Sequence, residues 1–204
     1  MSGATVVDDV QVPVSERGPS PRKVIVAYGF WLFLLSDIIM FAALFAAYAV
    51  LSQHTAGGPG GPQLFNRGHV LMETACLLAS SFTCGLFAIA VDQRHTRFAY
   101  ALALSICLFG SAFLGLEASE FSSMVAAGAG PTRSAFLSAF FALVGLHGVH
   151  VAVGLFWLLV MLAQLATLGF HSMVVGRVRC FCLFWHALDI VWIGIFTIVY
   201  LGAK

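Results

Sequence analysis

The chain has 204 residues, of which 60% are hydrophobic and only 9% are charged. A soluble domain carries roughly 25% charged residues, because its surface must face water. This composition excludes an ordinary soluble globule and, with a mean hydropathy of +0.96, predicts an integral membrane protein. The net charge of +1 provides no general attraction for nucleic acid, so no nucleic-acid partner is expected.

Residues 1–23 differ in character from the rest of the chain. They contain three acids, three bases and three prolines, with no apolar run among them. A secretory signal peptide needs such a run, so this segment is predicted to be a polar tail instead. Residues 24–204 are predicted to form one transmembrane domain.

Five continuous apolar stretches follow the tail. They cover about residues 28–51, 68–91, 98–121, 135–167 and 178–202. Each is long enough to cross a hydrocarbon core about 30 Å thick as a helix. Strands of a membrane barrel would alternate apolar and polar residues, and these stretches do not. The predicted fold is therefore all-α: a polytopic bundle of five transmembrane helices.

The lysines and arginines predict the direction of the helices. Seven of the ten fall in the tail and in the second and fourth connections, and three fall on the opposite side. Because basic residues are retained on the cytoplasmic side, we expect the N-terminus in the cytoplasm and the C-terminus outside. None of the ten is expected inside a span.

Eight acids and histidines do fall within the predicted spans. They are Asp37, Glu73, Glu117, Glu120, His147, His150, His186 and Asp189. Ionisable groups at membrane depth usually face a bundle interior or a partner. The acids are therefore protonated, paired with histidine, or paired with another subunit, and the sequence leaves these options open. All eight are candidates for inter-subunit contacts or proton-linked roles. We expect no catalytic, cofactor-binding or metal-binding residue.

A helical rise of about 1.5 Å per residue separates the eight residues by depth. Asp37, His147, His150, His186 and Asp189 are expected to meet in one mid-membrane layer. The three glutamates are expected nearer the outer surface. The histidines lack a recognisable metal pattern, so polar contact between helices or subunits is favoured over haem or metal ligation. The five cysteines contain no C-x-x-C pair and predict neither a disulfide framework nor a thiolate metal site.

Four segments of the chain match a known family. They are GFWLFLLSD at 29–37, ET at 73–74, FFALVGLHGVHV at 140–151 and FWHALDIVW at 184–192. On these segments the chain resembles subunit III of the haem-copper terminal oxidases, from about residue 24 to the end. Within that family it looks most like subunit 3 of the cytochrome bo-type ubiquinol oxidases, which also has five spans.

The resemblance implies an accessory subunit of a bacterial inner-membrane complex. That complex oxidises ubiquinol, reduces O₂ to water and translocates protons, while this subunit supports assembly, stability and proton uptake without catalysing the reaction itself. No redox centre is expected in this chain, and haem and copper are expected in the partner subunit I. Subunit I is the expected main contact, joined by subunit II, other small subunits and membrane lipids, including bound phospholipid.

Other functions remain open on the residues alone. The chain is also compatible with subunit III of a bacterial cytochrome c oxidase, which differs in its electron donor. A stand-alone proton-coupled transporter is a further alternative, although the internal repeats and broken helices common in transporters are not recognisable here. A purely structural or lipid-organising membrane protein is the last alternative.

Overall fold

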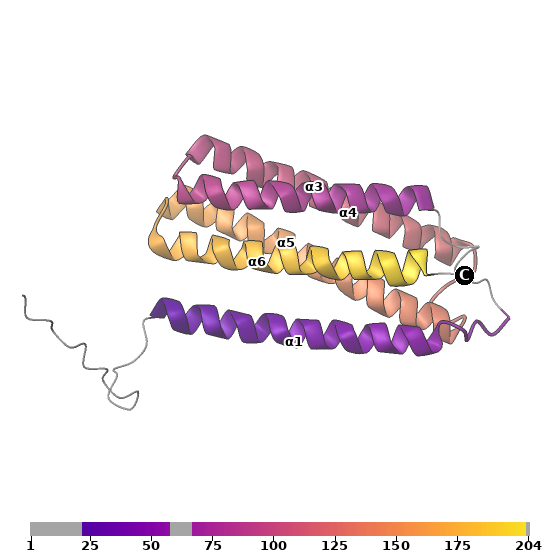
Figure 1. Cartoon of the computed structure of the whole chain (residues 1–204). Coiled ribbons are helices and arrows are strands. Elements are labelled where there is room, and N and C mark those ends of the chain that lie inside the picture. Colours follow the sequence, from indigo (N-terminus) through magenta and orange to yellow (C-terminus); the bar gives the residue numbers. More distant parts are fainter. Residues whose placement is uncertain (1–21, 58–66, 203–204) are drawn as a thin grey trace, which may run out of the picture.

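The computed structural model describes residues 22–57 and 67–202, and the regular structure in these residues is entirely helical (Figure 1). The helices are α1 (Arg22–Leu51), α3 (Arg67–Asp92), α4 (Thr96–Ala126), α5 (Ala135–Leu168) and α6 (Ser172–Ile195), with a π-helical continuation of α6, η2 (Phe196–Leu201). Five helical spans are long and apolar enough to cross a membrane. The predicted all-α bundle of five transmembrane helices is confirmed.

The helices lie side by side along one common direction, and successive helices run in opposite directions (Figure 1). α3 packs mainly against α4 and α6, and α5 packs against α6, α1 and α4. The connections α3–α4 and α5–α6 lie at one end of the bundle, and the α4–α5 connection and the C-terminus lie at the other (Figure 1). This alternation fits the predicted topology, while the side of the membrane on which each end lies stays a prediction.

Short local signals mark where the helices begin and end. The hydroxyl of Ser134 accepts a hydrogen bond from the backbone N–H of Leu137 at 3.2 Å and so caps the start of α5. α5 ends at Gly169, whose φ of 62° lies in the left-handed region that glycine adopts without steric strain. His171 then caps α6, with its ring nitrogen 3.5 Å from the backbone nitrogen of Met173.

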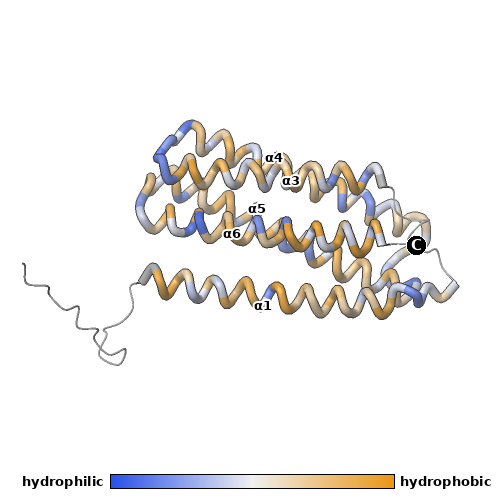
Figure 2. The backbone as a smooth tube through the Cα atoms, in the orientation of Figure 1, coloured by the Kyte–Doolittle hydropathy of each residue, from blue (hydrophilic) through white to orange (hydrophobic). Residues whose placement is uncertain are grey.

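The start of α6 corrects one prediction. The helix begins at Ser172 rather than near residue 178, so Arg177 and Arg179 lie within it and not in a loop. Arg97 similarly lies in the first turn of α4. The physical reason is length, because helices of 24 to 34 residues exceed the roughly 20 needed to cross the hydrocarbon. Hydrophilic residues gather at the end of the bundle that holds the α3–α4 and α5–α6 connections (Figure 2).

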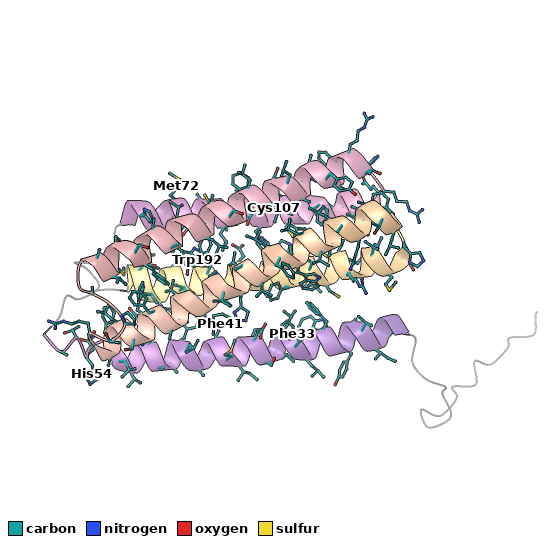
Figure 3. All side chains as sticks on the ribbon, turned by 180° about the vertical axis from the view of Figure 1, so that it is seen from behind. Phe33, Phe41, His54, Met72, Cys107 and Trp192 are labelled. Atoms are coloured by element: carbon teal, nitrogen blue, oxygen red, sulfur yellow. The ribbon has the colours of Figure 1, made fainter. Side chains whose placement is uncertain are left out.

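α1 is the peripheral helix of the bundle. Only 11% of its most apolar stretch is buried, against 28–39% in the other four helices. It is held chiefly by aromatic contacts: the ring of Phe30 lies 6.1 Å from that of Trp157, and the ring of Phe33 lies 6.3 Å from that of Phe184. Figure 3 shows Phe33 and Phe41 on α1 and Trp192 within the remaining helices.

The centre of the bundle is organised around Trp185 of α6. A Cβ atom on Gly154 of α5 would lie 2.9 Å from the indole ring, and one on Gly110 of α4 would lie 3.2 Å from it. The two glycines therefore make room for the ring between three helices. The indole Nε1 donates a hydrogen bond to the hydroxyl of Ser80 at 3.1 Å, so its polar edge is satisfied within the core.

Candidate functional site

Three glutamates from two helices form a buried carboxyl cluster. Glu73 of α3 is fully buried, and Glu117 and Glu120 of α4 are 4% and 7% exposed. Glu117 and Glu120 share one face of α4 because they are three residues apart. α3 and α4 are joined by a short connection and pack against each other along their length, so that face meets Glu73. The three carboxyl groups lie close enough to interact electrostatically.

Two residues outside the predicted set provide partners for this carboxyl cluster. The phenol of Tyr200 donates a hydrogen bond to Glu120 Oε2 at 2.9 Å. The ring Nε2 of His69 lies 3.7 Å from Glu73 Oε1 and 3.2 Å from the backbone oxygen of Leu116. His69 lies near the start of α3 and Tyr200 near the end of η2, and their spacing in the sequence did not indicate these contacts.

The carboxyl group of Glu117 lies directly against α5 at Gly148. A Cβ atom on Gly148 would lie 2.5 Å from both carboxyl oxygens of Glu117. Any other residue at position 148 would displace this carboxyl group. The glycine in the segment His147-Gly148-Val149-His150 is therefore the position at which α5 accommodates a side chain of α4.

Much of the hydrogen-bonding capacity of the cluster is unused within the described residues. Both oxygens of Glu73, Oε2 of Glu117 and Oε1 of Glu120 have no hydrogen-bond partner there. Buried polar groups are normally hydrogen-bonded to protein or to ordered water. A low-dielectric environment also favours the neutral form of a carboxyl group, which can then donate as well as accept. The arrangement is chemically suited to holding protons rather than to nucleophilic catalysis.

His147 is packed into the aromatic core. It is fully buried, its ring lies 5.3 Å from that of Trp192 in a stacked arrangement, and the ring of Phe113 meets it edge-on at 5.8 Å. Neither ring nitrogen has a hydrogen-bond partner among the described residues. One helical turn later, His150 is only partly buried, and its Nδ1 donates to the backbone oxygen of Leu146 at 2.8 Å.

The five residues expected in one mid-membrane layer do not all contact one another. Asp37 interacts electrostatically with His150 and faces the α1–α6 interface. His186 and Asp189 are directed toward α3, where the hydroxyl of Ser81 lies 2.8 Å from His186 Nδ1. These two groups of residues are separate because α1, which carries Asp37, and α3, which meets His186, pack against opposite sides of α6. Partners such as Ser81 are common residues in membrane helices, so the sequence alone could not identify them.

The thiol groups of Cys84 and Cys182 also meet across α3 and α6. Their sulfur atoms lie 3.4 Å apart in the buried core, and both cysteines are free. Within residues 22–57 and 67–202, no group of three histidine, cysteine or acidic side chains is arranged to hold a metal ion.

Comparison with known proteins places these features in a family. The family model described as cytochrome c oxidase subunit III matches residues 19–204. Subunit 3 of the cytochrome bo(3) ubiquinol oxidase of Pseudomonas aeruginosa is 51% identical over 174 residues, which cover 85% of this chain and 83% of that protein. Quinol oxidase subunit 3 of Bacillus subtilis is 41% identical over 173 residues, covering 85% of each chain.

This chain is also similar to a protein named as a subunit of a cytochrome c oxidase. Cytochrome c oxidase subunit 3 of Bacillus sp. strain PS3 is 42% identical over 177 residues, covering 85% of this chain and 84% of that protein. The match to the family model, residues 19–204, extends across the described helical bundle. The chain belongs to the cytochrome c oxidase subunit III family, the accessory subunits of the haem-copper oxidases.

Proposed function

We propose that this chain is the accessory third subunit of a bacterial ubiquinol oxidase of the haem-copper type. The observation that carries the proposal is the 51% identity over 174 residues to the ubiquinol oxidase subunit of Pseudomonas aeruginosa. In the assembled complex, ubiquinol supplies electrons that reduce O₂ to water, and protons are translocated. The complex is an inner-membrane assembly, with the N-terminus of this chain in the cytoplasm.

The redox chemistry belongs to partner subunits. Subunit I is the main partner and carries haem and copper, and subunit II and smaller subunits complete the complex together with bound phospholipid. In support of a chain that works with partners, the described residues include several buried polar atoms without a hydrogen-bond partner, which is the condition of a chain that contacts others within the membrane.

The intramembrane acids and histidines support assembly, stability and proton uptake. Asp37 and Asp189 lie near helix surfaces, where a neighbouring subunit can reach them. The carboxyl cluster is buried and holds protons without direct access to a substrate. Glu73→Gln keeps the size and shape of a neutral carboxyl group, so oxidase turnover in an assembled complex is expected to stay within a few-fold of wild type. Near-total loss of turnover at normal haem content would contradict this role.

The electron donor can be tested on the purified complex. O₂ consumption is measured with a reduced ubiquinol analogue and, separately, with reduced cytochrome c. We expect turnover with the quinol and none above background with cytochrome c. Turnover with cytochrome c alone would instead place the chain in a cytochrome c oxidase.

A further inference from the structure

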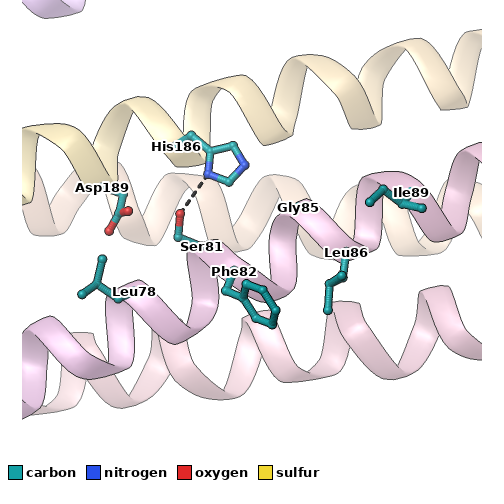
Figure 4. A pocket seen from close by; sticks show the side chains of 8 residues that line it. All are labelled: Leu78, Ser81, Phe82, Gly85, Leu86, Ile89, His186 and Asp189. Atoms are coloured by element: carbon teal, nitrogen blue, oxygen red, sulfur yellow. Dashed lines mark hydrogen bonds between the residues drawn. The ribbon is translucent and has the colours of Figure 1, made fainter.

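A groove on the outside of the bundle carries polar side chains. It lies between α3 and α6, is open on one side and has a volume of about 430 Å³ (Figure 4). Its lining consists of Leu78, Ser81, Phe82, Gly85, Leu86, Ile89, His186 and Asp189. All eight residues come from α3 and α6.

The groove lies near the middle of the membrane. Ser81 is near the centre of α3, and His186 is about 20 Å along the helical segment that starts at Ser172, at 1.5 Å per residue. Lipid headgroups lie outside a hydrocarbon core about 30 Å thick, so at this depth lipid offers only acyl chains. Phe82 and Ile89 are 70% and 53% exposed, which shows that the groove opens away from the bundle.

The polar groups in the groove are only partly satisfied. Ser81 and His186 are hydrogen-bonded to each other at 2.8 Å (Figure 4). Asp189 Oδ1 is buried and has no hydrogen-bond partner among the described residues. Acyl chains cannot donate a hydrogen bond, and an unsatisfied acceptor in hydrocarbon is unfavourable. Within this chain the neighbours of the Asp189 carboxyl group are Ser81 and His186, and they leave its Oδ1 without a hydrogen bond. No lysine or arginine lies in the middle of any described helix, so a further donor for Oδ1 can come from another chain.

We propose that this groove receives a transmembrane helix from another subunit of the oxidase. That helix donates a hydrogen bond to Asp189 from a basic or hydroxyl-bearing side chain, and it places apolar side chains against Phe82 and over Gly85. The choice of donor follows from charge complementarity with the carboxyl group. The proposal rests on the proposed function, because it requires that this chain be part of a larger complex.

Gly85 provides the space for such a helix. A Cβ atom added there would meet no atom within 4 Å, although the residue lines the groove. A larger side chain at this position therefore fills the groove without disturbing packing inside this chain. Gly115 of α4 is a matched control, because an added Cβ there also meets nothing within 4 Å and the residue lies outside the groove.

The first test compares Gly85→Leu with Gly115→Leu in the tagged full-length chain, purified from its native membranes in mild detergent. The measurement is haem recovered per tagged chain. Gly85→Leu is expected to lower this ratio roughly tenfold, as overpacking of a helix contact does, and Gly115→Leu to leave it unchanged. Equal ratios for wild type and Gly85→Leu, or equal losses in the two variants, would overturn the proposal.

A second variant gives opposite results for a helix and for lipid. If a helix donates to Asp189, Asp189→Leu leaves that donor unpaired, and haem per tagged chain falls. If the groove faces lipid, the same change removes an unfavourable polar group, and the ratio is unchanged or higher. Unchanged haem with loss of bound quinone or phospholipid would likewise overturn the proposal and assign the groove to a small ligand.

A photo-crosslinking amino acid in place of Phe82 tests the contact without filling the groove. The expected product is a cross-link to another oxidase subunit, and cross-links to lipid alone or to a second copy of this chain would overturn the proposal. Absence of haem with the wild-type chain would overturn the proposed function, and this proposal with it. Normal haem with wild type and with both groove variants would overturn this proposal alone.

Discussion

The close approach of Gly148 to Glu117 makes a quantitative prediction. Gly148→Ala introduces a Cβ atom 2.5 Å from both carboxyl oxygens and 2.8 Å from the carboxyl carbon. Real Cβ contacts do not occur below 3.0 Å, so the carboxyl group has to move. Glu117 is 4% exposed, so its carboxyl group can move only within the buried core. We expect an overpacking penalty of about 1–3 kcal/mol.

A control on the same helix separates this clash from helix propensity. A Cβ atom on Gly145 would lie 3.5 Å from the ring of Phe121, which is an ordinary contact. Gly145→Ala is therefore expected to be neutral or to stabilise α5 by roughly 0.5–1 kcal/mol. At about 2–4 °C per kcal/mol for a chain of this length, the two variants should differ in melting temperature by roughly 2–16 °C.

The assay is thermal melting of the detergent-solubilised chain, followed by loss of helical circular dichroism. A double variant that also carries Glu117→Ala tests the assigned cause. Without the carboxyl group, Gly148→Ala should no longer lower the melting temperature further, because the two positions are energetically coupled. Equal melting temperatures for Gly145→Ala and Gly148→Ala, or the same loss with and without Glu117, would refute the reasoning.

The other predictions concern one buried and one exposed contact. Tyr200→Phe removes the donor to Glu120 Oε2, which leaves a buried acceptor unpaired, so stability should fall by about 1–3 kcal/mol in the same melting assay. Tyr28→Phe is the control, because Tyr28 is exposed, and an equal effect of the two changes would contradict this explanation. Arg179→Gln breaks an exposed ion pair with Asp92 at 3.0 Å and should change stability by less than about 1 kcal/mol. A large loss would show that this pair is structural.

The fold was predictable because each helix corresponds to one continuous apolar run. α5 was predicted to within one residue at its C-terminal end, since Ser134 and Gly169 mark its boundaries and its interior carries no charge. The start of α6 was misplaced because Arg177 and Arg179 were assigned to a loop. Sequence distinguishes apolar from charged residues, but it does not distinguish a helix that ends at the membrane surface from one that projects beyond it.

The sequence identified the ionisable residues of the site, but it did not predict which residues they contact. Acids and histidines inside apolar runs are rare enough to be recognised individually. Their partners depend on how each helix is rotated, and the partners found here include Ser81 and Tyr200, residue types that occur throughout membrane helices. The meeting of Cys84 and Cys182 was missed for the same reason, because the two residues lie 98 positions apart on different helices.

The central claim is that this chain works as part of a haem-copper oxidase. The most direct measurement purifies the tagged full-length chain from native membranes in mild detergent. It then records the reduced-minus-oxidised spectrum and identifies every copurified protein by mass spectrometry. The account predicts haem absorbance together with the other oxidase subunits in fixed proportion to the tagged chain. A chain recovered alone, with no haem absorbance, would contradict it.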